Sequence, residues 1–356
     1  MCDWQHHRKE LNDSLVRWIR RKVETEYAED IALVCIYGSW LNGTANHLSD
    51  VDCYFVPKTD RGFGLARTFI LENVGYDIFP MSWERLEGIA SLDSGMQPLV
   101  GDVMVLWQGS REDLSKLQSL QQTLRKNLQD PDCTRRAAHN RCRQAANILA
   151  GAPENRGRLL AGYVLTILAE ALVLSKGEYF RFGTKRQYED LCRLFPGPVS
   201  ELFAQTVQAP DDASALAAAR QLLTEALKIL NIPPFPAQPE TPEIPPLGEP
   251  NAPALAELYQ EICSTFNKIY LCCKNSNSVL AFLSAGVLQW DLDEARALGL
   301  PPIRLLDRFD HRDLEAFSRA TREAENALVD FITSQGTNLT IYRSFPEFEA
   351  AQEETV

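Results

Sequence analysis

The pattern of apolar and polar residues divides the chain near residue 110. Before that point, four short apolar segments are rich in β-branched and aromatic residues and border on glycine or polar residues, which is typical of strands. These segments are Ile31–Tyr37, Val51–Val56, Val74–Phe79 and Val103–Trp107. Helical spacing occurs over residues 8–28 and again over residues 65–73. We therefore expect residues 1–110 to form a mixed-sheet α/β domain.

After residue 110 the strand signals stop and helical spacing recurs, which predicts a helical bundle over residues 111–231. The expected helices are 112–129, 132–150, 156–176, 184–194, 198–207 and 212–230. Residues 254–356 form a C-terminal helical region, either a second small bundle or an addition to the first, with an acidic tail after Phe345 that we expect to be frayed. The predicted fold class is α+β, an N-terminal mixed-sheet domain followed by helical bundles.

A proline-rich segment, residues 232–253, separates the two helical regions. It holds nine of the chain's 20 prolines, which exclude it from helices and central strands and favour extended polyproline geometry. We expect a semi-rigid linker or a strap over the surface. A role as a ligand for an SH3-type domain is the weaker interpretation.

The composition is that of an ordinary soluble globular protein. No segment approaches 18 uncharged apolar residues, and the charged first residues lack a following apolar segment, so we expect neither a membrane span nor a signal peptide. Nine cysteines without a CxxC pair favour a reducing cytoplasm. The net charge of −12 weighs against broad contact with nucleic acid.

The candidate chemistry lies where the first two strands meet. Gly38 and Ser39 follow the first strand, and Asp50 and Asp52 begin the second. Side chains alternate along a strand, so both carboxylates should leave the same face and repel each other unless a cation lies between them. Mg²⁺ prefers such oxygen ligands. The Gly-Ser turn offers backbone N–H groups and a hydroxyl for a phosphate.

The run Gly38-Ser-Trp-Leu-Asn-Gly43 leading to Ser49-Asp-Val-Asp52 resembles the nucleotidyltransferase superfamily that includes DNA polymerase β and the antibiotic-modifying adenylyltransferases. The resemblance covers about the first 110 residues. Gly43 and Ser49 agree with the bacterial branch, whereas Asn42 stands where that branch often has arginine. By this resemblance, Gly38, Ser39 and Ser49 belong to the nucleotide site.

A third carboxylate is expected on a later strand. Asp77 lies in the segment Val74–Phe79, and a strand–helix–strand unit could bring it beside the first pair. In the family, this carboxylate either completes the metal site or takes the proton from the acceptor hydroxyl. The alternative is an ion pair at the edge of the sheet.

The segment Leu159–Ser175 carries Glu170 as its sole formal charge, so we expect the central helix of the bundle. Together with the turn that holds Lys185, it resembles the helical domain of kanamycin- and lincosamide-type enzymes. The resemblance implies that Lys185 contacts a phosphate and that Glu170 is a base or binds a substrate amine. For Glu170 we favour a buried ion pair with Arg135, Arg136, Arg141 or Arg143.

The combined hypothesis is a Mg²⁺-dependent enzyme that moves AMP from ATP to a hydroxyl of a small aminoglycoside- or lincosamide-like molecule. Asp50, Asp52 and Asp77 would hold the metal, and Asp77 or Glu170 would be the base. One alternative is an enzyme that modifies protein or RNA. Another is a non-catalytic nucleotide-binding or interaction module. The family resemblance also leaves a homodimer open.

Overall fold

The computed structural model describes residues 3–236, 238–240 and 242–353. Its internal contacts divide the chain into two compact units. The first, called the sheet unit here, draws on Met1–Leu124, Ala256–Asn267 and Gly336–Val356. The second, the helical unit, comprises Arg125–Leu255 and Lys268–Gln335. The division cuts across the four predicted segments, because parts of the C-terminal region belong with the N-terminal sheet.

The sheet unit contains a six-stranded mixed sheet. The sequence predicted a mixed sheet in this part of the chain. The strand order is β5-β1-β2-β4-β3-β6, and the strands are β1 (Ile31–Tyr37), β2 (Asp52–Pro57), β3 (Arg67–Leu71), β4 (Val74–Pro80), β5 (Met104–Gln108) and β6 (Ile341–Tyr342). Neighbours run antiparallel except β2 with β4 and β3 with β6, which are parallel. The fold is therefore α+β, with a mixed sheet in the N-terminal part and helices after it.

One correction concerns residues 65–73, where a helix was expected. The segment forms strand β3, which pairs with β4 in an antiparallel hairpin after a 3₁₀ turn at Asp60–Leu65. Glu72 and Asn73 form its two-residue turn, with φ of 49° and 63°. Positive φ at both central positions is the backbone that hairpins prefer, because its twist matches that of the strands.

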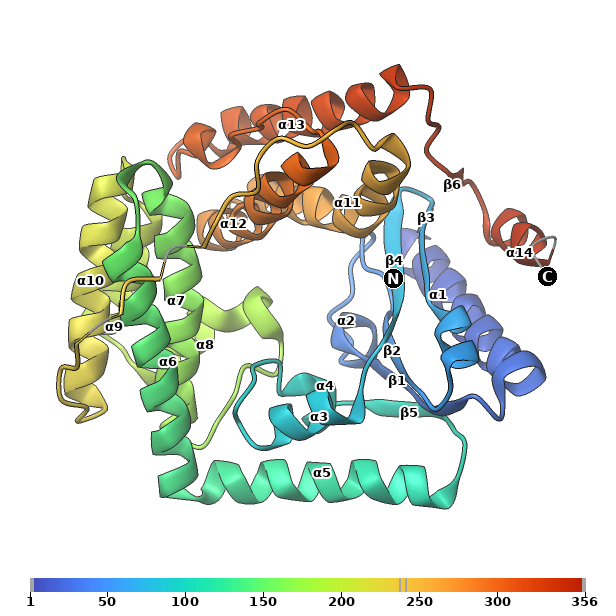
Figure 1. Ribbon diagram of the computed structural model, residues 1–356, viewed down its shortest axis with the longest axis horizontal. Helices are drawn as coiled ribbons and strands as arrows, with labels where there is room; N and C mark the ends of the chain where they lie inside the picture. Colours follow the sequence, from blue (N-terminus) through green and yellow to red (C-terminus); the bar gives the residue numbers. More distant parts are fainter. Residues whose placement is uncertain (1–2, 237, 241, 354–356) are drawn as a thin grey trace. The chain divides into compact units, whose positions relative to one another are not determined.

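One face of the sheet packs against helix α1 (Asp3–Lys22), which continues into a π-helical turn at Val23–Tyr27 (Figure 1). The helical spacing predicted over residues 8–28 is confirmed, and the helix buries Leu11, Leu15, Trp18 and Ile19 on its apolar side. Short helices complete this part of the unit: α2 (Gly38–Leu41), α3 (Trp83–Ala90) and α4 (Pro98–Gly101).

The expectation of a frayed C-terminal tail is wrong for the described residues. Strand β6 pairs with β3, and helix α14 (Phe345–Glu353) inserts Phe348 into the core of the sheet unit. The Phe348 ring is fully buried, stacks on Phe69 at 4.2 Å between ring centroids and meets Trp18 edge-on at 5.0 Å. Burial of this aromatic ring outweighs the acidic composition around it.

The helices predicted over residues 111–231 are confirmed, with ends that differ by a few residues. They are α5 (Arg111–Gln129), α6 (Pro131–Gly151), α7 (Gly157–Leu174), α8 (Gln187–Leu194), α9 (Pro198–Val207) and α10 (Asp212–Ile229). The C-terminal region, predicted only to be helical, contains α11 (Ala252–Lys274), α12 (Ser278–Glu294) and α13 (Leu314–Ser334). Helix α7 is central in the helical unit, against α6, α9 and α10 (Figure 1). The stretch Glu154–Leu174 is long and apolar enough to span a membrane, but 78% of its apolar window is buried inside the protein.

The proline-rich segment runs as a strap along the helical unit, within its described residues. The backbone N–H groups of Gln238 and Glu240 donate to Asn147, and Arg156 donates to the carbonyl of Pro242 at 2.6 Å. Further on, Gly248 donates to the carbonyl of Arg296. Ala237 and Thr241, which belong to the predicted linker, lie outside the described residues.

Candidate functional site

Three neighbouring strands bring the candidate site together. Tyr37, the last residue of β1, pairs with Asp52 at the start of β2. In the parallel pair of β2 and β4, Cys53 lies opposite Ile78. Asp52 and Asp77 each precede one of these partners, so they lie at the same level on adjacent strands and on the same face, with backbones about 5 Å apart. The sequence thus predicted the neighbourhood of Asp77 correctly, although a hairpin delivers it.

Asp50 lies just before β2 and is half-buried. The pKa values of Tyr37 and Tyr76 are raised first by burial, and the charge of Asp50 raises both further, so Asp50 lies within electrostatic reach of both phenols. The pKa of Tyr37 is raised first by burial and then by the charges of Asp52, Asp50 and Asp77. The three candidate carboxylates therefore gather around one phenol.

Gly38 allows the Asp52 carboxylate to lie directly against the backbone. Its φ is +76°, and a Cβ atom there would lie 1.8 Å from Oδ2 of Asp52 and 2.6 Å from its Cγ. Any other residue would have to displace the carboxylate. Ser39 follows in the short helix α2, where its carbonyl accepts the N–H of Thr44 at 3.0 Å. The Gly-Ser turn and the carboxylates thus share one end of the sheet.

Ser49 has a structural position in the loop before Asp50. Its side chain is buried, and its Oγ accepts the N–H of Asn46 at 2.9 Å. Its backbone N–H donates to the carbonyl oxygen of Asn46 at 3.1 Å. This geometry favours a role in shaping the loop that delivers Asp50 over the direct nucleotide contact that the family resemblance implied.

Asp77 is the one of the three candidate carboxylates for which a raised pKa is found. Its side chain is exposed at the edge of the site, yet the surrounding protein raises its pKa by desolvation. A hydrogen bond from the hydroxyl of Thr68, at 3.1 Å, acts in the opposite direction. A carboxylate with a raised pKa is a better proton acceptor near neutral pH than an ordinary aspartate.

Glu261 is a fourth carboxylate near the site, and the sequence did not indicate it. Glu261, on helix α11, has a raised pKa because of burial first and then the charges of Asp77 and Glu257. The helix approaches β4 at Gly75, where a Cβ atom would lie 2.7 Å from both Sγ of Cys263 and the carbonyl oxygen of Gln260. Only the glycine two residues before Asp77 hints at this approach in the sequence, and it does not identify the partner.

The two remaining candidates belong to the helical unit. Glu170 on α7 accepts a hydrogen bond from Nε of Arg141 on α6 at 3.0 Å, which confirms the favoured ion pair. The Arg141 side chain is 8% exposed and that of Glu170 is 33% exposed, so the carboxylate is less buried than expected. Lys185 lies in the 3₁₀ turn Gly183–Arg186. Its charge and that of Lys268 partly offset the burial that raises the pKa of Cys272 to about 11.

The donor chemistry of the sheet site suits Mg²⁺, because carboxylate oxygens beside a polar turn are the ligands this ion prefers. Across residues 3–236, 238–240 and 242–353, however, no three His, Cys, Asp or Glu side chains are arranged as a ready ligand set. Mutual repulsion of carboxylates gives a physical reason for such spacing. Asp50, Asp52 and Asp77 are thus neighbours that could converge on a cation.

No protein-family model matches the chain, and no curated protein matches it. One solved structure to which it is similar is a nucleotidyltransferase-like protein from Exiguobacterium sibiricum. The two chains are 15% identical, with a TM-score of 0.35, over 60% of this chain and 77% of that one. At that level of similarity, function has to be argued from the residues of this chain.

Proposed function

We propose that the protein is a Mg²⁺-dependent nucleotidyltransferase that moves AMP from ATP to a hydroxyl of a small molecule and releases pyrophosphate. The gathering of Asp50, Asp52 and Asp77 around Tyr37 carries this proposal. The Asp52 carboxylate against the backbone of Gly38 supports it, because the turn residues meet the acids at one end of the sheet. Neighbouring carboxylates repel each other, and metal chemistry is a common reason to keep them together.

Asp50, Asp52 and Asp77 are the residues that would hold Mg²⁺. When bound, the ion would neutralise charge on the triphosphate and stabilise the leaving oxygen. The backbone of Gly38 and the hydroxyl of Ser39 would hold the β- and γ-phosphates. By the family resemblance, Lys185 would contact a phosphate.

In the transfer step, the acceptor hydroxyl oxygen attacks the α-phosphorus of ATP. A new phosphorus–oxygen bond forms while the bond from the α-phosphorus to the bridging oxygen of the β-phosphate breaks, and pyrophosphate leaves with that electron pair. We assign the proton of the hydroxyl to Asp77, whose raised pKa suits a base. Glu170 is the second candidate, but Arg141 already donates to one of its oxygens.

The acceptor we propose is a small, cationic molecule of the aminoglycoside or lincosamide kind, and the setting is the cytoplasm. Glu261 lies within electrostatic reach of both Asp77 and Glu257, so negative charge extends from the site along helix α11. The chain as a whole carries a net charge of −12, which would attract a cation and disfavour a nucleic-acid acceptor.

The test is incubation of the full chain with Mg-ATP and a panel of aminoglycosides, lincosamides and small-molecule cell extract, followed by mass spectrometry. The proposal predicts an acceptor that gains one adenylyl group, with pyrophosphate released in equal amount and nothing formed in EDTA. Adenylylated protein or extended RNA instead would support an enzyme with a macromolecular acceptor. A chain that binds ATP without any metal-dependent turnover would be a binding module, and the proposal would fail.

A further inference from the structure

Helix α1 buries two polar side chains in its first half, beside its apolar ones. Asn12 is 1% exposed and Arg8 is 8% exposed. They are four residues apart and so lie on the same side of the helix, toward the sheet. Buried polar groups of this kind are retained only where hydrogen bonds satisfy them. The hydrogen-bond partners of Arg8 and Asn12 lie next to the candidate carboxylates.

Asn12 joins the two segments that deliver the candidate carboxylates. Its Nδ2 donates to the carbonyl oxygen of Ser49 at 3.3 Å, and its Oδ1 accepts the hydroxyl of Tyr76 at 2.7 Å. Ser49 immediately precedes Asp50, and Tyr76 immediately precedes Asp77. One buried amide thus bridges the backbone next to Asp50 and the strand residue next to Asp77.

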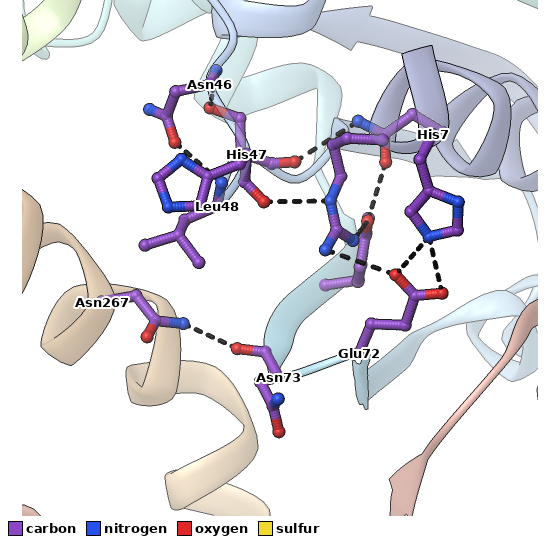
Figure 2. A network of polar contacts seen from close by, with 11 residues as sticks. His7, Asn46, His47, Leu48, Glu72, Asn73 and Asn267 are labelled. Atoms are coloured by element: carbon purple, nitrogen blue, oxygen red, sulfur yellow. Dashed lines mark hydrogen bonds and ion pairs between the residues drawn. The ribbon is translucent and has the colours of Figure 1, made fainter. Parts of the chain in front are cut away.

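Arg8 repeats the same bridge one turn earlier. Its Nε donates to the carbonyl of His47 at 3.1 Å and its Nη1 donates to the hydroxyl of Tyr76 at 3.2 Å. Its Nη2 lies 3.5 Å from the carboxylate of Glu72, which also contacts His7. Figure 2 shows the network running from the loop at Asn46, His47 and Leu48 to His7 and Glu72.

The loop itself is closed by its own hydrogen bonds. Oδ1 of Asn46 accepts the N–H of Leu48 at 2.8 Å, and Oγ of Ser49 accepts the N–H of Asn46. These contacts give the loop a fixed shape, and Leu48 packs against the apolar core of the sheet unit. Arg8 and Asn12 add polar links from the loop backbone to Tyr76 on β4.

We propose that Asn12 and Arg8 are positioning residues that set the separation of Asp50 and Asp77, and so tune the affinity of the carboxylates for a divalent cation. The inference rests on the proposed function, because it concerns the same metal site. Partners that orient metal ligands typically change metal affinity about 10- to 100-fold when they are removed. Neither side chain would touch the ion or the nucleotide.

The test compares wild type with Asn12→Ala and Tyr76→Phe, using the full chain. Mn²⁺ affinity is measured by electron paramagnetic resonance, and amide hydrogen exchange is followed in peptides that cover Thr44–Asp50. We expect Mn²⁺ to bind about tenfold more weakly in Asn12→Ala, together with faster exchange in this loop. Tyr76→Phe keeps the ring and removes only the hydroxyl that Asn12 and Arg8 contact. It should also weaken Mn²⁺ binding and speed exchange in the loop, and it provides the test if Asn12→Ala folds poorly.

Asp30→Asn is the matched control. Asp30 is 8% exposed and accepts the hydroxyl of Thr59 at 2.6 Å, but it precedes β1 at the end opposite Tyr37. Its loss should lower the melting temperature without changing Mn²⁺ affinity or exchange in the loop. Equal Mn²⁺ affinity in wild type, Asn12→Ala and Tyr76→Phe would overturn the positioning role and leave the proposed function standing. Absence of Mn²⁺ binding in wild type would instead overturn the proposed function, and this inference with it.

Discussion

Replacing Gly38 with alanine is the sharpest perturbation the site offers, because a single methyl group would enter the space of the Asp52 carboxylate. The new Cβ would lie 1.8 Å from Oδ2, whereas ordinary van der Waals contact begins at 3.4 Å. The carboxylate oxygen therefore has to move by roughly 1.6 Å, the difference between these two distances. A displacement of about 1 Å in a catalytic group can lower turnover about 100-fold. We expect at least that loss of nucleotidyl transfer in Gly38→Ala.

The backbone adds a second effect that has to be separated from the first. Gly38 has φ of +76°, a conformation that costs about 1–2 kcal/mol in a residue with a Cβ atom. Gly43 provides the matched control, because its φ is +74° and a Cβ there meets nothing within 4 Å. Both alanine variants should lose a similar free energy of unfolding in urea titrations.

The two variants should differ in the site alone. Calorimetric titration should show that Gly38→Ala binds Mg²⁺ and ATP more weakly than Gly43→Ala, and transfer assays should show the large loss only in Gly38→Ala. If both variants keep the same metal affinity and turnover, the Asp52 carboxylate is not a metal ligand.

Three further predictions concern single residues. Asp77→Asn should lower turnover by about 100- to 10,000-fold and should also weaken Mg²⁺ binding, because we propose this side chain both as a metal ligand and as the base. Its pH–rate profile should lose an acid limb that lies above pH 3.8, since activity falls as Asp77 is protonated through its raised pKa. An unchanged Mg²⁺ affinity would leave Asp77 as a base alone. Glu170→Gln should lower the melting temperature and leave turnover unchanged, because Arg141 loses its charged partner. If turnover is lost at unchanged stability, Glu170 and not Asp77 accepts the proton of the acceptor hydroxyl. Phe348→Ala should lower the free energy of unfolding by about 3–5 kcal/mol in urea titrations, because the ring is fully buried against Phe69. A loss below about 1 kcal/mol would mean that helix α14 contributes little to the stability of the sheet unit.

The strands and most helices were predictable because their signals are local. Ile31–Tyr37 is a short β-branched run, and Leu159–Ser175 is apolar almost throughout, so burial follows from composition alone. The β3–β4 hairpin was missed for the opposite reason. Its turn has Glu72 and Asn73 at positive φ, without the glycine that usually marks a two-residue hairpin turn. Glutamate seldom adopts positive φ, so the sequence gave no signal for a turn there.

The long-range contacts were out of reach of pattern arguments. Phe348 lies in an acidic tail, and its partners Trp18 and Phe69 are nearly the whole chain away in sequence. Glu261 sits on an ordinary amphipathic helix, and nothing around it indicates that it lies near Asp77. Asp52 and Asp77 were predictable as neighbours because strands place them. Asp50 was identified by the spacing of the Gly-Ser and Asp-x-Asp residues, although it lies in the loop before β2 and not in the strand as expected. The buried Arg8 and Asn12 gave only the weak signal of polar residues on an apolar helix face.

The thermal shift produced by ATP, with and without Mg²⁺, is the sharpest test of a metal–nucleotide site at Asp50, Asp52 and Asp77, because it needs no knowledge of the acceptor. Wild type should be stabilised by about 2.7 kcal/mol when Mg-ATP is present at 100 times its dissociation constant, and far less by the same ATP in EDTA. Asp52→Asn should lose the difference between the two conditions. Equal shifts with and without the metal in wild type, or an undiminished metal dependence in Asp52→Asn, would contradict the assignment of these carboxylates to a metal–nucleotide site.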